Sequence, residues 1–404
     1  MNQTTSDTSK FEIQSRNVVY HDYETSLGDF ALNIGKRLIS DAEARHHYLA
    51  KWAWLRDMLP FSPKPIPALE KTIHFHDRSL PITLASPIIL AAGGNKYGEN
   101  LPHFASMGFG GVTVGSATRE ARDGNTFRPR VHLLPLDRSM NNSMGLNNPG
   151  IEKIARAVDV TLGKCHRRKL AIGISVADTP GMEENDKKIS DILYTFRKAY
   201  GAADYIELNV SCPNTGTGRM DNHIGFLNDL LREIMAVRKN LVPKKAVLVK
   251  LSPDLGSQNL EAILQIISDT DVTGLVLFNT FLSDKARYLK MQTPSEQIPV
   301  VAANGHKGGL SGRILYKNTY PAVKFIRSQL PKVTIFACGG IDHGAKIWDL
   351  MEAGADAVQC YTALAYRWNA IHKMNRELFE TMRKKGIKSL DDYNSAPIAH
   401  ISDD

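Results

Sequence analysis

The feature that most constrains the fold is a regular alternation of short apolar runs and longer amphipathic segments from about residue 71 onward. Each run has the length and the β-branched content of a buried strand, and a stretch with helical periodicity follows it. The predicted strands are 87–92, 111–115, 170–176, 205–210, 246–251, 274–279, 333–337 and 357–361. Eight such units predict a (β/α)8 TIM barrel in the α/β class. A doubly wound open sheet is the alternative, but it usually needs fewer units.

Composition sets outer limits on function. The chain has 404 residues, 43% of them hydrophobic, and its net charge is 50 − 42 = +8. This diffuse basic excess suits an anionic membrane surface or anionic small molecules, and the Lys/Arg runs are too short to predict a nucleic-acid partner. No apolar run reaches the roughly 18 residues of a spanning helix. The four cysteines show neither CxxC pairs nor metal-ligand spacing, which predicts free thiols, a reducing compartment and no metal.

The segment before the barrel has a different pattern. Residues 1–24 are polar and without period, so we predict disorder; 25–70 reads as a helical hairpin with a proline-rich linker, 71–390 as the barrel and 391–404 as a tail. Basic residues are interleaved with apolar ones, including Trp52, between residues 27 and 59. The hairpin either packs flat on the barrel or lies with a cationic, amphipathic face on an anionic bilayer.

Polar groups are concentrated where the predicted strands end. The connections 116–149 and 280–320 are too long for simple turns, and loops at the C-terminal ends of barrel strands are where binding groups belong. Lys250 emerges from an apolar strand, which is expensive unless it meets an anion or an electron-rich ring. Convergent uncharged amides would suit an imide or a carboxyamide ligand. The candidates are Asn142, Asn209, Asn214 and Asn279.

A thiol stands between two of these amides. Cys212 follows the strand at 205–210 directly and precedes a proline and Asn214. A cysteine in this position can act as a general base on a planar, amide-rich substrate held by Asn209 and Asn214. The alternative is a buried thiol that only packs, which is the commoner fate of a cysteine.

Glycine-rich segments in the last quarter of the chain suggest phosphate binding. The segment 308–312 reads as a glycine-rich loop, and Gly339-Gly340 and Tyr361-Thr362 follow the seventh and eighth strands. Barrels commonly bind a phosphate with backbone N–H groups at these two positions. No GxGxxG follows an early strand, so a nicotinamide-binding unit is not supported.

Taken together, the motifs resemble those of the dihydroorotate dehydrogenase family. They are Ala-Ala-Gly before Lys96, Val-Gly-Ser at 114–116, Asn-Val-Ser-Cys-Pro-Asn at 209–214, Val-Lys-Leu-Ser-Pro-Asp at 249–254, Gly-Gly-Leu-Ser-Gly at 308–312 and Val-Gln-Cys-Tyr-Thr-Ala at 358–363. The resemblance covers roughly residues 71–385. The N-terminal helices resemble those of the membrane-associated, quinone-dependent class, where such helices frame a tunnel to the flavin.

The resemblance implies a cofactor, a substrate and a base. FMN would be held by Ala92, Gly93, Ser116, Asn209, Lys250, Ser311, Gly312, Gly339, Gly340, Tyr361 and Thr362. Dihydroorotate would be held by Lys96, Asn142, Asn209, Asn214, Asn279 and Thr280. Cys212 would remove the C5 proton while hydride passes from C6 to flavin N5, and Lys250 would steady the negative charge on the reduced ring.

Some positions depart from the quinone-dependent pattern. That class usually has serine where Cys212 stands, an asparagine at Ser175 and often an arginine at Leu133, and Cys212 is typical of the soluble, fumarate-type class.

From the resemblance as a whole we expect FMN-dependent oxidation of dihydroorotate to orotate in pyrimidine biosynthesis, with a membrane quinone as acceptor. Fumarate or another soluble acceptor, a different dihydropyrimidine, and a non-catalytic membrane-surface protein are the alternatives. We expect a peripheral protein on the cytoplasmic side of the membrane, or a cytoplasmic one if the hairpin binds no lipid.

Overall fold

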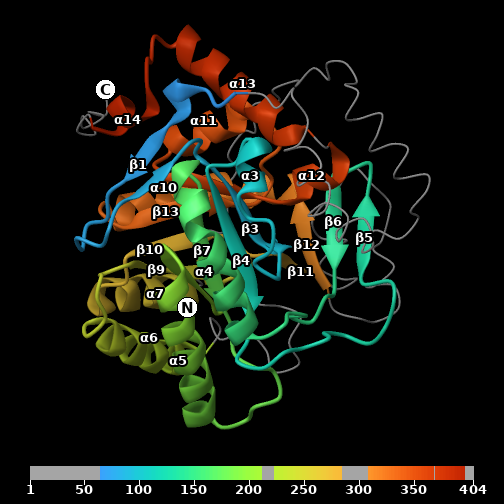
Figure 1. Ribbon diagram of the computed structural model, residues 1–404, viewed down its shortest axis with the longest axis vertical. Coiled ribbons are helices and arrows are strands. Elements are labelled where there is room, and N and C mark those ends of the chain that lie inside the picture. The colour runs from blue at the N-terminus through green and yellow to red at the C-terminus, as the bar shows by residue number, and fades with distance from the viewer. Residues whose placement is uncertain (1–63, 212–222, 284–307, 368, 396–404) are drawn as a thin grey trace, which may run out of the picture.

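Eight parallel strands close into a barrel in the computed structural model, which describes residues 64–211, 223–283, 308–367 and 369–395 (Figure 1). In chain order they are β3 (Ile88–Asn95), β4 (Gly111–Ala117), β7 (Ala171–Val176), β8 (Tyr205–Asn209), β9 (Ala246–Leu251), β10 (Gly274–Leu277), β13 (Thr334–Cys338) and β14 (Ala357–Cys360). The last strand, β14, pairs with the first, β3, and this closure excludes an open sheet. The predicted TIM barrel is confirmed, and each predicted strand overlaps an observed one.

Helices cover the outside of the barrel, because each buries one apolar stripe against the strands. In α4, for example, Ile151, Ile154 and Val158 are fully buried at helical spacing. The longer helices are α4 (Ile151–Arg167), α5 (Asn185–Ala202), α6 (Ile224–Arg238), α7 (Ser257–Thr270), α10 (Tyr316–Gln329), α11 (Gly344–Glu352) and α13 (Ala370–Lys384). The shorter ones are η1 (Pro67–Leu69), α3 (His103–Ser106), η3 (Arg313–Leu315), α12 (Thr362–Tyr366) and α14 (Leu390–Ser395).

A second, antiparallel sheet is built from the two long connections. Its strands run in the order β11 (Phe281–Ser283), β12 (Gly308–Gly312), β6 (Ser139–Asn142) and β5 (Val131–Leu134). The glycine-rich segment 308–312 was expected to be a loop, and this expectation is wrong, because it forms β12. Glycine is needed there for close packing: a Cβ on Gly309 would lie 2.2 Å from Thr280 Oγ1, and one on Gly308 2.6 Å from Asn141 Oδ1.

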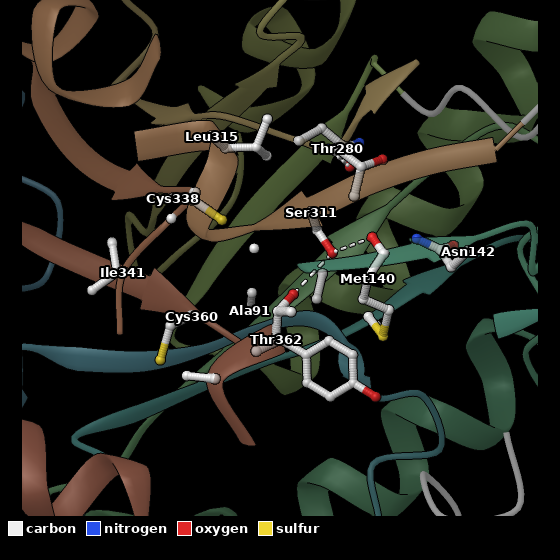
Figure 2. Close-up of a pocket in the computed structure, with 18 of the residues that line it drawn as sticks. Ala91, Met140, Asn142, Thr280, Ser311, Leu315, Cys338, Ile341, Cys360 and Thr362 are labelled. Carbon is white, nitrogen blue, oxygen red and sulfur yellow. Dashed lines mark hydrogen bonds between the residues drawn. The ribbon is translucent and has the colours of Figure 1, made fainter. Parts of the chain in front are cut away.

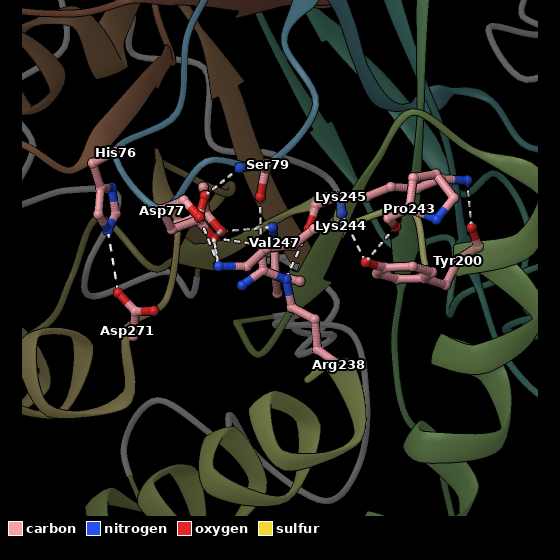
Figure 3. Close-up of polar contacts among 11 residues, drawn as sticks. His76, Asp77, Ser79, Tyr200, Arg238, Pro243, Lys244, Lys245, Val247 and Asp271 are labelled. Carbon is pink, nitrogen blue, oxygen red and sulfur yellow. Dashed lines mark hydrogen bonds and ion pairs between the residues drawn. The ribbon is translucent and has the colours of Figure 1, made fainter. Parts of the chain in front are cut away.

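A hairpin closes the N-terminal end of the barrel. Its strands are β1 (Lys71–Ile73) and β2 (Ile82–Leu84), and their apolar side chains join the cluster that fills the barrel interior. Next to it, the buried Asp77 accepts a hydrogen bond from the Arg238 guanidinium of α6 (Figure 3). It accepts another, 3.2 Å long, from Thr273 Oγ1. This end of the barrel is therefore closed by apolar packing and by buried ion pairing.

The predicted helical hairpin at 27–59 and the predicted disordered segment 1–24 lie outside the described residues. The linker before the barrel is described from residue 64 and contains η1. At the other end, α14 spans the predicted start of the tail at residue 391. Among the helices of the described ranges, none has both the length and the apolar content to cross a bilayer.

Candidate active site at the C-terminal end of the barrel

One cavity opens at the C-terminal ends of the barrel strands, partly covered by the second sheet (Figure 2). The predicted site residues that line it are Ala92, Gly93, Lys96, Ser116, Asn142, Asn209, Lys250, Asn279, Thr280, Ser311, Gly312, Gly339, Gly340, Tyr361 and Thr362. The structure therefore brings together groups spread over nearly 270 residues, from Ala92 to Thr362. The predicted base Cys212 and the predicted ligand Asn214 lie outside the described residues. The individual roles of all these residues remain predictions.

The amide cluster is held by its own hydrogen bonds. Asn209 Nδ2 donates to Ser116 Oγ over 2.8 Å, and Asn279 Nδ2 donates to Asn209 Oδ1 over 3.0 Å. Asn279 Nδ2 also lies 3.1 Å from Ser211 Oγ, which fixes the start of the segment that carries Cys212. Ser116 Oγ is 2.9 Å from Ser175 Oγ. Two strand ends thus present preoriented amides rather than freely rotating ones.

The second sheet adds groups from the opposite side of the cavity. Asn142 lines the cavity, and its Nδ2 donates to the Gly309 carbonyl over 3.1 Å, which ties β6 to β12 at this register pair. Lys96 is buried and donates from Nζ to Asn147 Oδ1. Asn147 also lines the cavity, and it was not predicted because a single asparagine in a long connection carries no pattern.

One end of the cavity is rich in glycine and hydroxyl side chains. Gly312, Gly339 and Gly340 have φ values of +107°, +131° and +78°, a backbone region that favours glycine. Ser311 Oγ donates to the Met140 carbonyl and lies 2.9 Å from Thr362 Oγ1, as Figure 2 shows. Hydroxyls and backbone N–H groups converge here from β12 and from the segments after β13 and β14.

A buried cation forms the floor of the cavity. Lys250 Nζ lies 3.4 Å from Glu207 Oε1 and 3.1 Å from Gln359 Oε1. Burial alone would lower the pKa of Lys250, but its interactions with Glu207 and, to a smaller extent, Cys338 together leave the net pKa above the ordinary value. Lys250 was predicted from the sequence but its partners were not, although a glutamate inside an apolar strand is the same kind of signal.

Across the part of the chain that the structure describes, no cluster of three or more His, Cys, Asp or Glu side chains could hold a metal ion. Cys165, Cys338 and Cys360 carry free thiols. Cys338 lines the cavity, and burial raises its pKa, which favours the neutral thiol.

Comparison with known proteins decides the family. The family model for dihydroorotate dehydrogenase matches residues 77–382, which include almost the whole barrel. The chain belongs to the dihydroorotate dehydrogenase family. The predicted resemblance is therefore confirmed for the part of the chain that carries the cavity.

Curated members of the dihydroorotate dehydrogenase family are similar over most of the barrel. A protein of Xanthomonas oryzae pv. oryzae is 33% identical over 290 residues, or 70% of this chain and 77% of the relative. One from Dichelobacter nodosus is 33% identical over 288 residues, 70% of this chain and 81% of the relative. Both are named dihydroorotate dehydrogenase (quinone), which supports the predicted resemblance to the quinone-dependent class.

Solved structures of the family share the fold. The crystal structure of the Eimeria tenella dihydroorotate dehydrogenase in complex with ferulenol superposes with a TM-score of 0.74 at 24% identity. The alignment covers 88% of this chain and 96% of the other. A ligand-free structure of the same enzyme gives a TM-score of 0.73. These likenesses concern the barrel architecture.

Proposed function

We propose that this protein oxidises dihydroorotate to orotate, with FMN as its cofactor and a quinone as electron acceptor, and so serves pyrimidine biosynthesis. The observation that carries the proposal is the cavity at the C-terminal end of a barrel of this family. It combines a buried cation, a cluster of oriented amides and a glycine-rich end whose backbone would suit a phosphate. A non-catalytic surface protein would have no need to retain all three.

The residues of the cavity fit FMN. Gly93 lines the cavity with φ +97°, and a Cβ there would meet no atom within 4 Å, so the backbone borders open space that a flat ring can approach. The phosphate would lie against the backbone of Gly312, Gly339 and Gly340, and Lys250 would contact the ring. The remaining predicted FMN contacts are Ala92, Ser116, Asn209, Ser311, Tyr361 and Thr362. When bound, FMN supplies the acceptor for the hydride that leaves C6 of dihydroorotate.

The protein's own groups would orient the substrate and move its proton. The Lys96 ammonium would pair with the dihydroorotate carboxylate. The planar amide edge would bond to the oriented side chains of Asn142, Asn209 and Asn279, together with Thr280 and Asn214. Cys212 Sγ would take the proton from C5 as the hydride leaves C6, so the two hydrogens depart to separate acceptors. The buried Lys250 charge would stabilise the negative charge of the reduced flavin.

Membrane attachment belongs to the proposal as well. Its motivation is the amphipathic, cationic pattern between residues 25 and 60, which suits an anionic bilayer. We place the protein at the cytoplasmic surface of the membrane, where a quinone is within reach of the barrel.

The choice of acceptor provides the test. Purified protein receives dihydroorotate with either a short-chain quinone or fumarate, and orotate formation is followed by its ultraviolet absorbance. We expect turnover with the quinone and little with fumarate. Orotate formed only with fumarate would contradict the quinone assignment, which matters because Cys212 resembles the soluble class. A flavin-loaded protein that oxidises another dihydropyrimidine but not dihydroorotate would contradict the substrate.

A further inference from the structure

A chain of polar side chains crosses the barrel interior beneath the cavity. It starts at Lys250 on β9, passes to Glu207 on β8 and Gln359 on β14, and continues to Thr113 on β4. Gln359 Nε2 lies 2.9 Å from Glu207 Oε2 and 3.1 Å from Thr113 Oγ1. Thr113 Oγ1 is in turn 2.7 Å from the Tyr205 hydroxyl. In the closed barrel β14 is not a neighbour of β8 or β9, so these bonds span the interior.

The chain is sealed from solvent by the apolar interior of the barrel. Glu207, Gln359 and Thr113 are 0% exposed, and the Lys250 side chain is 5% exposed. Leu248 and Phe336 belong to the apolar cluster that fills the same interior. A carboxylate placed here is costly unless it is paired with a cation and hydrogen-bonded. Glu207 meets both conditions through Lys250 and Gln359.

Few charged groups face the Lys250 ammonium. Glu207 approaches it from β8, and the Cys338 thiol acts on it from β13. The other neighbour of β9 is β10, whose residues Gly274–Leu277 carry no titratable side chain. Burial raises the pKa of Cys338, which keeps this thiol neutral. Glu207 is therefore the anion that can balance the lysine inside the barrel.

We propose that Glu207 is a positioning residue that keeps Lys250 protonated beneath the oxidised flavin, with Gln359 bracing the pair. The inference rests on the proposed binding of FMN to this cavity. Its consequence is electrostatic preorganisation: the cation is in place before electrons arrive, and Lys250 has no proton to acquire when the flavin is reduced. Without the carboxylate, burial would favour neutral lysine, which would then take up a proton on reduction.

The pH dependence of the flavin midpoint potential reports how many protons the protein and flavin take up on reduction. Spectroelectrochemical titrations from about pH 7 to about pH 9, well below the ordinary lysine pKa, compare the wild-type interior with Glu207→Gln. Both are made in a Cys212→Ser background, so that the predicted base does not contribute a proton. We expect a steeper slope for Glu207→Gln, equivalent to as much as one more proton per two electrons. Adding Lys250→Met to Glu207→Gln should remove the extra proton.

Two matched variants separate charge from packing. Glu207→Asp keeps the carboxylate and should keep the slope of the parent. Thr113→Val removes a hydroxyl further along the same chain without changing any charge, and it should also leave the slope unchanged. A merely structural role for Glu207 predicts lower stability in Glu207→Gln with an unaltered slope, and that result would overturn the inference.

The outcomes remain separable from failure of the proposed function. If the purified parent protein binds no FMN, the proposed function fails. If it binds FMN and Glu207→Gln keeps the slope of the parent, only the role of Glu207 fails. If Glu207→Gln does not fold, the titration of the parent protein is the remaining test. A constant number of protons taken up per electron across the pH range supports the inference. An additional proton taken up by the parent as the pH rises contradicts it.

Discussion

Two buried lysines in this molecule show how strongly the surroundings of a single residue determine its charge. Lys250 has the Glu207 carboxylate beside it, and its pKa lies above the ordinary value despite burial. Lys71 on β1 is 2% exposed, and within the described residues its Nζ has no hydrogen-bond partner. Burial lowers its pKa to about 8, although Asp356 and Asp391 act in the opposite direction. The first lysine belongs to the cavity, whereas the second is expected to reduce the stability of the fold.

We expect Lys71→Met to stabilise the protein near neutral pH. The unfolded chain holds the lysine proton up to about pH 10.5, whereas the folded state releases it near pH 8. Below pH 8 the lysine therefore lowers the free energy of unfolding by about 3 kcal/mol, and this loss shrinks as the pH rises from about 8 to about 10.5. Urea unfolding at about pH 7 and about pH 10 should show a gain at the lower pH that largely disappears at the higher. An equal gain at both would contradict this explanation.

The thiol at residue 212 gives a second prediction at this scale. A cysteine has a pKa of about 8.5 and is partly ionised near neutral pH, unlike a hydroxyl. Cys212→Ser should keep FMN and orotate binding but slow flavin reduction, most severely at low pH. Anaerobic stopped flow with dihydroorotate measures the rate.

Cys165→Ser is the matched control for this substitution, because Cys165 is a free, buried thiol on α4, away from the cavity lining. Its rate of flavin reduction should equal that of the wild type. An unchanged rate in Cys212→Ser would remove Cys212 from the mechanism.

At the scale of elements, the barrel was predictable and the second sheet was not. β9 is continuously buried, and its apolar run reveals the strand with the observed bounds. In contrast, β12 consists of glycines, a leucine and a serine, and it is a strand only because Gly309 packs against Thr280 and pairs with β6. Such long-range packing leaves no local pattern in the sequence.

The candidate site divides in the same way. Groups at strand ends, such as Asn209 and Lys250, were predicted because the C-terminal ends of all strands of a TIM barrel meet at one face. The pairing of Glu207 with Lys250 and Gln359 was not predicted, because it depends on contacts across the barrel interior.

The ion pair between Arg238 and Asp77 joins α6 to the hairpin segment at the N-terminal end of the barrel. Arg238 of α6 and Asp77 are 2% and 0% exposed in their side chains. Burial would raise the pKa of Asp77, but hydrogen bonds from Ser79 and Arg238 lower it to about 2. Removing Arg238 leaves the buried Asp77 carboxylate with the partly exposed Lys244 ammonium, 3.7 Å away, as its remaining cation. Arg238→Met should therefore cost up to about 3–5 kcal/mol of unfolding free energy. Chemical denaturation followed by circular dichroism measures it.

The double variant Asp77→Asn with Arg238→Met should recover part of this loss, because no unpaired charge then remains. A double variant that is less stable than either single variant would show that the pair contributes through packing rather than charge.

At the scale of the whole molecule, our proposal gives the barrel and the N-terminal segment separable tasks. The cavity residues all lie between Ala91 and Ala370, whereas the amphipathic pattern lies before residue 60. Deleting residues 1–60 should therefore preserve flavin reduction by dihydroorotate but weaken liposome binding and quinone reduction. Co-sedimentation with anionic vesicles and a quinone-linked assay measure the two losses. If both properties survive the deletion, the assignment of the segment to the membrane is wrong.

The most direct test of the central claim is made without oxygen. Dihydroorotate is added to the purified, flavin-loaded protein, and the visible flavin absorbance is followed. We expect rapid bleaching, formation of orotate in equal amount to the flavin, and recovery of the colour when quinone is added. A flavin that stays oxidised in the presence of dihydroorotate would contradict the account.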